Sequence, residues 1–541
     1  TINHNNSFFM IKRTKQYISS LPSDLPSSLV VFLVALPLCL GIALGSGAPL
    51  FSGIIGGIVG GIVVGILSGS QLSVSGPAAG LTAVVVVAIG KMPAFEAFLL
   101  SVLLAGVFQM IFGFIKAGVI GDYVPSAVIK GMLAAIGVIL IMKQFPHLVG
   151  YNKDYAGDET FLQGNQENTF SGIIRSFRYL VPLALIIGVL GIGIQLLWDK
   201  VLVKKSNLFK LIPAPLVVVL AGIGINQWAI SAWPALAVGN SHLVNIPVAQ
   251  SVSEFGSFFT FPGFKYITLP QVWITAVTIA IIASLETLLN IEAADDLDPY
   301  QRVTPTNREL KAQGIGNIVS GLLGGLPVTS VVVRTSVNIN SGGKSKLSTI
   351  FHGVLLLLCV AFIPKLLNLI PLSALAAVLI YTGYKLANPA LFKLFYKKGW
   401  DQFMPFVITI VAILLSDLLI GILIGCGVGL FFVMRSNFRS AILVVSDGTN
   451  YLFRLRKDVS FLNKPIIKNK LETVPEDASV LIDATRADFI DKDIIEVIED
   501  FMKHAPLKNI RVELKRSNYK EQGFSLQPFG AAKTEKAVLA H

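Results

Sequence analysis

Charged residues and cysteines are both scarce in this 541-residue chain. Charged residues make up 14% of it and hydrophobic residues 53%, a composition far more apolar than that of soluble globular proteins. The cysteines, Cys39, Cys359 and Cys426, are odd in number and lie within apolar blocks, which argues against a disulfide framework. The sequence also lacks an HExxH motif, a Walker A loop and zinc-spaced cysteines and histidines. We therefore expect a membrane protein that is not an enzyme and needs no cofactor.

The apolar residues are gathered in blocks of about 18 to 25 residues, each long enough to cross a hydrocarbon core of roughly 30 Å as a helix. The first block, which starts at Leu29, is too long for the core of a signal peptide and is expected to be retained. The predicted membrane helices are 29–48, 50–68, 76–90, 95–115, 124–142, 174–197, 212–229, 270–292, 309–323, 328–340, 346–363, 371–386, 402–416 and 417–434.

The distribution of lysine predicts the orientation of these helices, because short cytoplasmic loops are enriched in Lys and Arg. With a cytoplasmic N-terminus, the loop 230–268, whose one Lys or Arg is Lys265, lies outside. The loops after the sixth and twelfth helices lie inside and hold Lys200, Lys204, Lys205, Lys210, Lys385, Lys393, Lys397 and Lys398. We expect a multi-pass protein of the cell (inner or plasma) membrane with both termini in the cytoplasm. The net charge of +12 then favours anionic lipid and does not indicate a nucleic acid partner.

The composition changes after Arg435. The run VLIDATRADFIDKDIIEVIEDFMKHAPLKNIRVEL reads as an apolar strand, a charged amphipathic helix and a second strand, which predicts a small cytoplasmic α/β domain over 437–520. Residues 521–541 are rich in Ala, Lys and Gly and are expected to be disordered. The polar residues 1–28 are expected to form a cytoplasmic segment ahead of the membrane domain, 29–436.

Two of the predicted membrane segments are interrupted in the same way. The third breaks at Gly76-Pro77 in SVSGPAAG, and the tenth lies in GGLPVTSVVVRTSVN, residues 324–338. A break at membrane depth frees backbone groups that lipid cannot satisfy, so it must be buried in protein or face water. Breaks at matching places indicate two inverted repeats, about 29–229 and 268–436, with a substrate site at the membrane midplane. A proline kink packed between helices is the alternative.

Two charged residues stand out at membrane depth. Facing half-helix N-termini form an anion site, and Arg334 would add positive charge to it, at an insertion cost of about 2.5–3.5 kcal/mol. A salt bridge between two helices is the alternative role of Arg334. Glu286, with Asn290 one turn later on the same helix face, could pair with Arg334, carry a coupling proton, or ligate Na⁺ together with hydroxyl and backbone oxygens such as those of Thr329.

The chain resembles the SulP family of sulfate permeases, bicarbonate transporters and prestin-like proteins over essentially its whole length. The segments that carry the resemblance are VALPLCLGIALGSGAPLFSGI, SVSGPAAG, YVPSAVIKGMLAAIGVILIMKQ, IPAPLVVVLAGI, NRELKAQGIGNIVSGLLGGLPVTSVVVRTSVNINSGGKSKLS and IPLSALAAVLI. The resemblance implies an all-α polytopic fold of fourteen transmembrane segments, arranged as a 7+7 inverted repeat with core and gate domains. It further implies elevator-type alternating access, a cytoplasmic STAS-like domain and a homodimer.

The resemblance also implies where an anion binds, namely between the third and tenth helices, and it places the family's acidic position of the eighth helix on Glu286. On this sequence the implied coupling-ion residues are Glu286, Asn290 and Thr329. The implied substrate-binding residues are Pro37, Ser75, Gly76, Ala78, Ala79, Thr329, Ser330, Val332, Val333 and Arg334.

Three positions depart from the family pattern. Leu38 follows Pro37, which is more like bicarbonate-type members than sulfate-type ones; Val333 can offer an anion only its backbone N–H; and Lys492-Asp493 stands where regulated STAS domains have serines. One arginine and two helix ends supply roughly two units of positive character, part of which Glu286 cancels. We therefore favour bicarbonate over sulfate, with Na⁺ or H⁺ coupling. Sulfate or dicarboxylate transport, anion exchange and an uncoupled channel or motor-like function are the alternatives.

Overall fold

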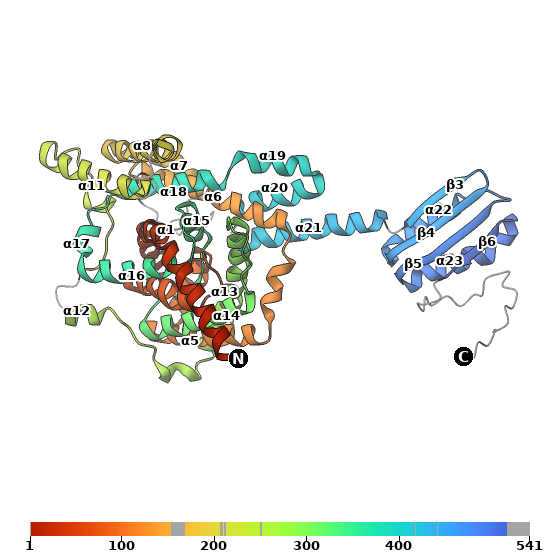
Figure 1. The fold of residues 1–541 in the computed structure, drawn as a ribbon, viewed down its shortest axis with the longest axis horizontal. Helices are drawn as coiled ribbons and strands as arrows, with labels where there is room; N and C mark the ends of the chain where they lie inside the picture. The colour runs from red at the N-terminus through yellow and green to blue at the C-terminus, as the bar shows by residue number, and fades with distance from the viewer. Residues whose placement is uncertain are drawn as a thin grey trace. The chain divides into compact units, whose positions relative to one another are not determined.

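The computed structural model describes residues 2–152, 168–205, 209, 212–248, 252–416, 418–440 and 442–516. It divides into two compact units, Thr1–Val428 and Gly429–His541, which are coloured red to light blue and blue in Figure 1. The predicted disordered tail, 521–541, lies outside the described residues.

The first unit is built almost entirely of helices. Its N-terminal half contains α1 (Ile2–Gly45), α2 (Leu50–Val59), a π-helical turn (Gly60–Val64), α3 (Gly65–Leu67), β1 (Ser75–Pro77), a 3₁₀ turn (Ala79–Leu81), α4 (Thr82–Lys91), α5 (Phe95–Phe114), a second 3₁₀ turn (Ala117–Tyr123), α6 (Ser126–Leu148), α7 (Thr169–Ser176), α8 (Pro182–Leu197), a second π-helical turn (Trp198–Leu202), α9 (Val203–Lys205) and α11 (Ala214–Ala232).

A connecting stretch and a second set of helices complete this unit. The connection holds two 3₁₀ turns (Asn240–His242 and Phe264–Thr268) and α12 (Val252–Ser257). The C-terminal half contains α13 (Pro270–Leu297), α14 (Thr306–Leu323), β2 (Val328–Ser330), α15 (Val332–Asn340), α16 (Leu347–Phe362), α17 (Pro364–Leu367), α18 (Leu372–Leu386), α19 (Pro389–Lys398), α20 (Trp400–Leu415) and the first part of α21 (Leu418–Ser440), a helix that crosses the boundary between the two units at Val428.

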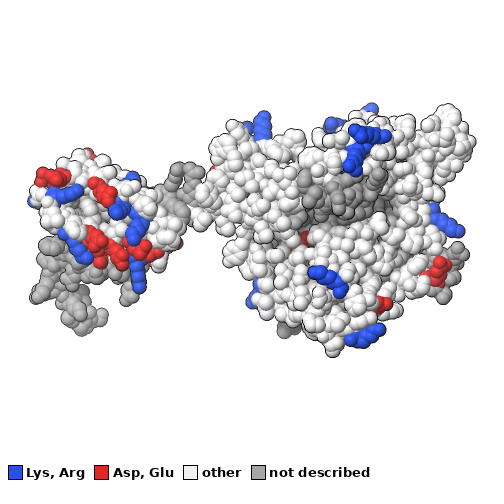
Figure 2. Space-filling view, turned by 180° about the vertical axis from the view of Figure 1, so that it is seen from behind, with Lys and Arg blue, Asp and Glu red and all other residues white. Residues whose placement is uncertain are grey.

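The predicted polytopic helical fold is confirmed. Each predicted membrane segment overlaps a helix, and seven of the described helices are long and apolar enough to cross a membrane. Figure 2 shows one face of this unit, on which charged side chains are few and scattered, as expected of a surface that meets lipid.

Several element boundaries differ from the prediction. α1 begins at Ile2 and runs through Pro22 and Pro26, so residues 2–28 are helical and continuous with the first membrane helix. The helix expected at 174–197 is split into α7 and α8, because Pro182 opens a new helix at its first turn. The segments expected at 76–90 and 328–340 each begin as a short strand. The lysine-rich α19 was not predicted, because it is not an apolar run.

The membrane helices pack in two groups. The core group consists of α1–α5 and α13–α16, and the gate group of α6–α9, α11 and α18–α20; helices of each group pack mainly on one another and lie on different sides of the unit in Figure 1. An ion pair between Lys130 of α6 and Asp296 of α13, 2.5 Å from nitrogen to oxygen, joins the two groups.

Within the core group, α5 and α14 approach so closely that glycine is required at their crossing. A Cβ atom at Gly106 would lie 2.5 Å from the Gly314 carbonyl oxygen and 2.6 Å from the Ile318 nitrogen. Both neighbours are backbone atoms and cannot move aside by a rotamer change. The crossing fixes α14, which in turn positions the site described below.

The second unit is an α/β domain with a four-stranded sheet in the order β3-β4-β5-β6. Its elements are β3 (Ile442–Asp447), β4 (Asn450–Val459), α22 (Lys464–Glu472), β5 (Ser479–Ile490), α23 (Lys492–His504) and β6 (Arg511–Lys515). The predicted strand, helix and strand are β5, α23 and β6. The β3–β4 hairpin and α22 were not predicted from the sequence. β4, β5 and β6 run parallel, and their buried apolar residues form one core with those of α22 and α23.

The α5–α14 crossing generates a stability prediction. Gly106→Ala should lower the free energy of unfolding of the first unit by about 1–3 kcal/mol, because the added methyl group forces two backbones apart. Gly193→Ala in α8 is the matched control, since a Cβ atom there meets no atom of the described residues within 4 Å, and it should be neutral or slightly stabilising. Thermal unfolding of both variants in detergent, followed by size-exclusion chromatography, measures the difference. Equal melting temperatures would contradict the assigned crossing.

Candidate functional site

Two short strands meet in the middle of the first unit. β1 and β2 pair antiparallel, with Ser75 opposite Ser330, Gly76 opposite Thr329 and Pro77 opposite Val328. All residues of both strands are buried. A proline stands at each strand, Pro77 within β1 and Pro327 directly before β2. Proline has no backbone N–H to donate to a helical hydrogen bond, so each one interrupts the helix at this place. The predicted breaks therefore fall at one place in the fold, where they satisfy part of each other's backbone.

A helix begins directly after each strand. β1 leads through the 3₁₀ turn into α4, and β2 leads into α15. Because the strands are antiparallel, the two helices run away from the crossing in opposite directions, with both N-termini beside it. The N-cap residues Ala78 and Val331 have extended backbones and make no capping side-chain hydrogen bond. The first N–H groups of a helix have no partner within the helix, so two N-terminal turns converge on the crossing.

Two polar residues of α14 hold the strands in place. Asn317 accepts a hydrogen bond from the Val328 nitrogen at 2.6 Å and donates one to the Val328 oxygen at 2.9 Å. One turn earlier, the side-chain nitrogen of Gln313 donates to the Ser75 hydroxyl at 2.7 Å and to the Glu309 carboxylate at 3.1 Å. α14 therefore fixes β2 through Asn317 and β1 through Gln313.

These residues of α14 were not among those predicted from the sequence. Glu309, Gln313 and Asn317 are fully buried, and their spacing of four residues places them on one face of the helix. That polar spacing within an otherwise apolar region was the signal that could have identified them.

Further hydrogen bonds join the crossing to the helices around it. The Ser73 and Ser330 hydroxyls lie 2.7 Å apart, and the Val74 nitrogen donates to the Thr335 hydroxyl at 3.0 Å. Asn290 of α13 donates to the Ser330 oxygen at 2.5 Å. Buried backbone polar groups in a membrane require such partners.

Arg334 lies in the first turn of α15 and is fully buried. Its guanidinium contacts the α-carbon side of Gly76, where any side chain would collide with it, and it donates to the Pro77 oxygen at 3.4 Å. The Nε and Nη1 atoms have no hydrogen-bond partner among the described residues. The guanidinium therefore places a positive charge against β1, and two of its nitrogens keep their hydrogen-bonding capacity.

Glu286 reaches the crossing from α13. Its carboxylate lies against Gly80, where a Cβ atom would be 3.1 Å from Oε1, and the side chain is 4% exposed. The Arg334 guanidinium faces Gly76 and the Glu286 carboxylate faces Gly80, so the two charged groups contact different parts of the segment Gly76–Gly80.

The residues predicted from the sequence lie around the crossing, except Pro37. Those in the strands, at the start of α4 and α15, and on α13 are Ser75, Gly76, Ala78, Ala79, Thr329, Ser330, Val332, Val333, Arg334, Glu286 and Asn290. Pro37 lies inside α1 and lines a separate cavity of about 260 Å³. Because the side chain of Val333 is apolar, its backbone N–H is the one hydrogen-bond donor that it can offer at the start of α15.

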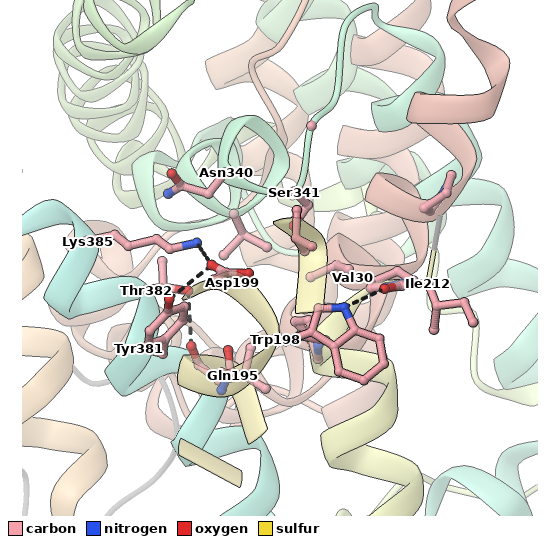
Figure 3. Close-up of a pocket in the computed structure, with 18 of the residues that line it drawn as sticks. Val30, Gln195, Trp198, Asp199, Ile212, Asn340, Ser341, Tyr381, Thr382 and Lys385 are labelled. Atoms are coloured by element: carbon pink, nitrogen blue, oxygen red, sulfur yellow. Dashed lines mark hydrogen bonds and ion pairs between the residues drawn. The ribbon is translucent and has the colours of Figure 1, made fainter. Parts of the chain in front are cut away.

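Two cavities lie between the core and gate groups, along different stretches of α1. One contains Pro37, Gly41 and Leu44 of α1 together with His147 and Leu372 of the gate group. The other, about 240 Å³ in volume, contains Pro26 and Val30 of α1, the end of α15 and parts of α8, α11 and α18, and it is shown in Figure 3. Val34, Val332, Val333 and Val378 belong to one buried apolar cluster of this interface, so the core group meets the gate group through tightly packed apolar side chains.

His147 and Asn152 line the first of these cavities, and a second histidine, His242, is joined to them. Asn152 links the ring of His147, at 2.6 Å, to the ring of His242, at 2.7 Å. Burial lowers the pKa of His242, which keeps this loop residue neutral at physiological pH.

Comparison with known sequences identifies relatives of this chain. The profile of the sulfate permease family matches residues 21–412. A putative sulfate transporter, YvdB of Bacillus subtilis, is 27% identical over 72% of this chain and 69% of its own length. The bicarbonate transporter BicA of Synechocystis is 26% identical over 61% of this chain and 53% of its own, so the chain spans about half the length of that relative.

Solved structures show the same fold. The transmembrane domain of a cyanobacterial bicarbonate transporter BicA aligns with 76% of this chain and 97% of its own at a TM-score of 0.51 and 24% identity. The murine Solute Carrier 26 family member A9 anion transporter, in its inward-facing state, aligns with 91% of this chain and 85% of its own at a TM-score of 0.61 and 15% identity. With the profile match covering most of the chain, this protein belongs to the sulfate permease family of sulfate and bicarbonate anion transporters.

Proposed function

We propose that this protein is a secondary transporter of a small inorganic oxyanion, and that it favours bicarbonate over sulfate. The observation that carries the proposal is the convergence of two helix N-termini and the buried Arg334 on the β1–β2 crossing. Helix N-termini offer backbone N–H groups and positive partial charge to an anion, and a guanidinium grips an oxyanion with paired hydrogen bonds.

The charge at the crossing supports a monovalent substrate. Arg334 contributes one positive charge and each helix end about half of one, while the carboxylate of Glu286 beside Gly80 offsets part of the sum. A monovalent anion is balanced there without a bound cation, whereas a divalent one needs additional positive charge. The relatives include proteins described as bicarbonate transporters and as sulfate transporters, so they support both substrates.

Candidate ligands for a coupling ion lie near Glu286. The Oδ1 atom of Asn290 is buried without a hydrogen-bond partner among the described residues, and the Thr329 hydroxyl belongs to the strand that Asn290 contacts. One carboxylate, one amide oxygen and a hydroxyl are ligands that suit Na⁺, a hard cation. Protonation of Glu286 is the alternative form of coupling, and anion exchange without either ion is the second candidate function.

Transport requires that the crossing open to each side in turn. The core group carries the proposed anion site, and the gate group is joined to it mainly by apolar packing. We infer an elevator-type movement of the core group against the gate group, with the two interface cavities as parts of the two access routes. A homodimer in the cell membrane, with both termini cytoplasmic, is part of the same proposal.

A substrate panel tests the function directly. The purified full chain is reconstituted in proteoliposomes, and uptake of labelled bicarbonate, sulfate and fumarate is measured with and without Na⁺ and pH gradients. Faster uptake of bicarbonate, driven by one of the two gradients, supports the proposal. Gradient-independent exchange would favour the second candidate function, and absence of uptake for all three anions would refute both.

Arg334 gives the sharpest mutational prediction. Arg334→Ala should reduce uptake at least tenfold while the protein remains folded, because it removes anion-binding charge and also a membrane insertion cost of about 2.5–3.5 kcal/mol. Arg334→Lys should restore part of the activity, since an ammonium lacks the planar fork of a guanidinium. Arg308→Ala, at an exposed position of α14, is the matched control. Wild-type uptake by Arg334→Ala would remove Arg334 from the site.

Glu286 gives a second prediction, about coupling. Glu286→Gln keeps the shape of the side chain but removes its charge, so uptake should lose its response to the Na⁺ or pH gradient while anion exchange persists. Uptake and counterflow, measured beside the melting temperature, separate a loss of coupling from a loss of fold. Glu292→Gln, on the same helix, controls for removal of a carboxylate from α13. If Glu286→Gln responds fully to both gradients, the coupling role is wrong.

A further inference from the structure

An ion pair lies inside the cavity of Figure 3, where the proposed mechanism does not use it. The walls of this cavity come from both helix groups: Val30 of α1 and Asn340–Gly342 at the end of α15 on one side, and α8, α11 and α18 on the other. Among the described residues that line it, Asp199 and Lys385 carry charge. Asp199 lies in the π-helical turn that follows α8, and Lys385 lies in α18 of the gate group.

Three side chains form this cluster. Lys385 Nζ lies 2.6 Å from Asp199 Oδ2, and the Tyr381 hydroxyl donates to the same oxygen at 2.9 Å. The Lys385 and Asp199 side chains are 31% and 34% exposed. Figure 3 shows Lys385 and Asp199 directed toward each other beneath Asn340. The pair is therefore open to the cavity, and the two charges cancel there.

The cavity lies at the opposite end of α15 from the proposed anion site. α15 has nine residues, so its two ends are about 13 Å apart at 1.5 Å per residue. Val30, which lines the cavity, and Pro37 are separated by about 10 Å along α1 on the same scale. An anion that reaches the site from this side passes close to Asp199 and Lys385.

We propose that Asp199 is a specificity-determining residue that selects anions by their charge. By neutralising Lys385, it keeps this entry cavity near zero net charge, so that a divalent anion gains no advantage over a monovalent one. The inference rests on the proposed transport function and adds to it the residue that sets valence selectivity.

The physical basis is that the energy of an ion in a given potential is proportional to its charge. Asp199→Asn leaves the charge of Lys385 uncompensated and raises the potential of the cavity. The logarithm of the change in apparent affinity should then be twice as large for sulfate as for bicarbonate. A fall in KM on the order of threefold for bicarbonate corresponds to a fall on the order of tenfold for sulfate. High salt should make both of these changes smaller, because it screens partly exposed charges.

The variants form a matched set. Lys385→Gln leaves the negative charge of Asp199 uncompensated and should raise the KM of both anions. The logarithm of this rise should again be twice as large for sulfate as for bicarbonate. Tyr381→Phe removes a hydrogen bond to Asp199 without changing charge and should leave valence selectivity unchanged. Asp401→Asn removes a carboxylate at an exposed position of α20 that does not line the cavity and controls for overall charge. Since both charged side chains are about one-third exposed, neither single variant leaves a fully buried charge.

Anion kinetics in proteoliposomes are the first readout. Initial rates are measured for bicarbonate and sulfate at low and high ionic strength, with gluconate as the balancing anion. Where an anion binds without being carried, its inhibition constant replaces KM.

Fluorescence quenching is the second readout and does not depend on transport. Trp198 lines the cavity, so it reports on the local potential when the other four of the five tryptophans are replaced by phenylalanine. Iodide should quench Trp198 more strongly in Asp199→Asn than in the parent chain, while quenching by neutral acrylamide should stay unchanged.

The outcomes separate this inference from the proposed function. Stronger iodide quenching together with a larger KM change for sulfate supports the role of Asp199. Equal KM changes for the two anions, or unchanged iodide quenching in a chain that carries anions, overturn it. If the parent chain carries no anion, the proposed function fails and the inference falls with it, whatever the quenching shows.

Discussion

The unsatisfied backbone of two broken membrane helices is the constraint on which the rest of this structure depends. Each break at Pro77 and Pro327 exposes peptide groups that lipid cannot hydrogen-bond. The fold meets this demand by pairing the breaks as β1 and β2 and by bringing Asn317, Gln313 and Asn290 to the remaining groups. The close α5–α14 contact at Gly106 follows from the same need, because α14 must be held where two of those side chains reach the strands.

Once the strands are paired, the electrostatics of the site follow from geometry. Antiparallel pairing places two helix N-termini at one point, and α15 carries Arg334 in its first turn. A side chain in the first turn of a helix points back toward the N-terminus. The guanidinium of Arg334 is therefore directed at β1, beyond the start of α15. Gly76 is needed opposite it, because a Cβ atom at this position would collide with Nη1. Positive charge and backbone donors are thus assembled by the same few residues.

Sequence reasoning identified the two segments that form the candidate site but not the polar residues of α14 that hold them. Hydrophobic blocks and two proline breaks were sufficient to predict a polytopic repeat fold, since membrane length and backbone satisfaction leave few alternatives. The extended conformation at Ser75 and Val328 was not predicted, because a helical repeat suggests half-helices and the pairing partner lies about 250 residues away in the chain. Glu309, Gln313 and Asn317 were missed for a similar reason: their partners become apparent only when α14 is placed beside both strands.

The interface between the helix groups has the packing that the proposed elevator-type movement requires. The core group is tied internally by buried hydrogen bonds, which are directional and costly to leave unmade. Valine side chains dominate its contact with the gate group around α15, and apolar contacts are non-directional, so they can be exchanged for similar ones when the groups slide. The Lys130–Asp296 pair is partly exposed, and a partly exposed ion pair contributes only about 0–1 kcal/mol. The strong interactions therefore lie within the helix group that carries the candidate site, and the weak ones lie where the proposed movement would take place.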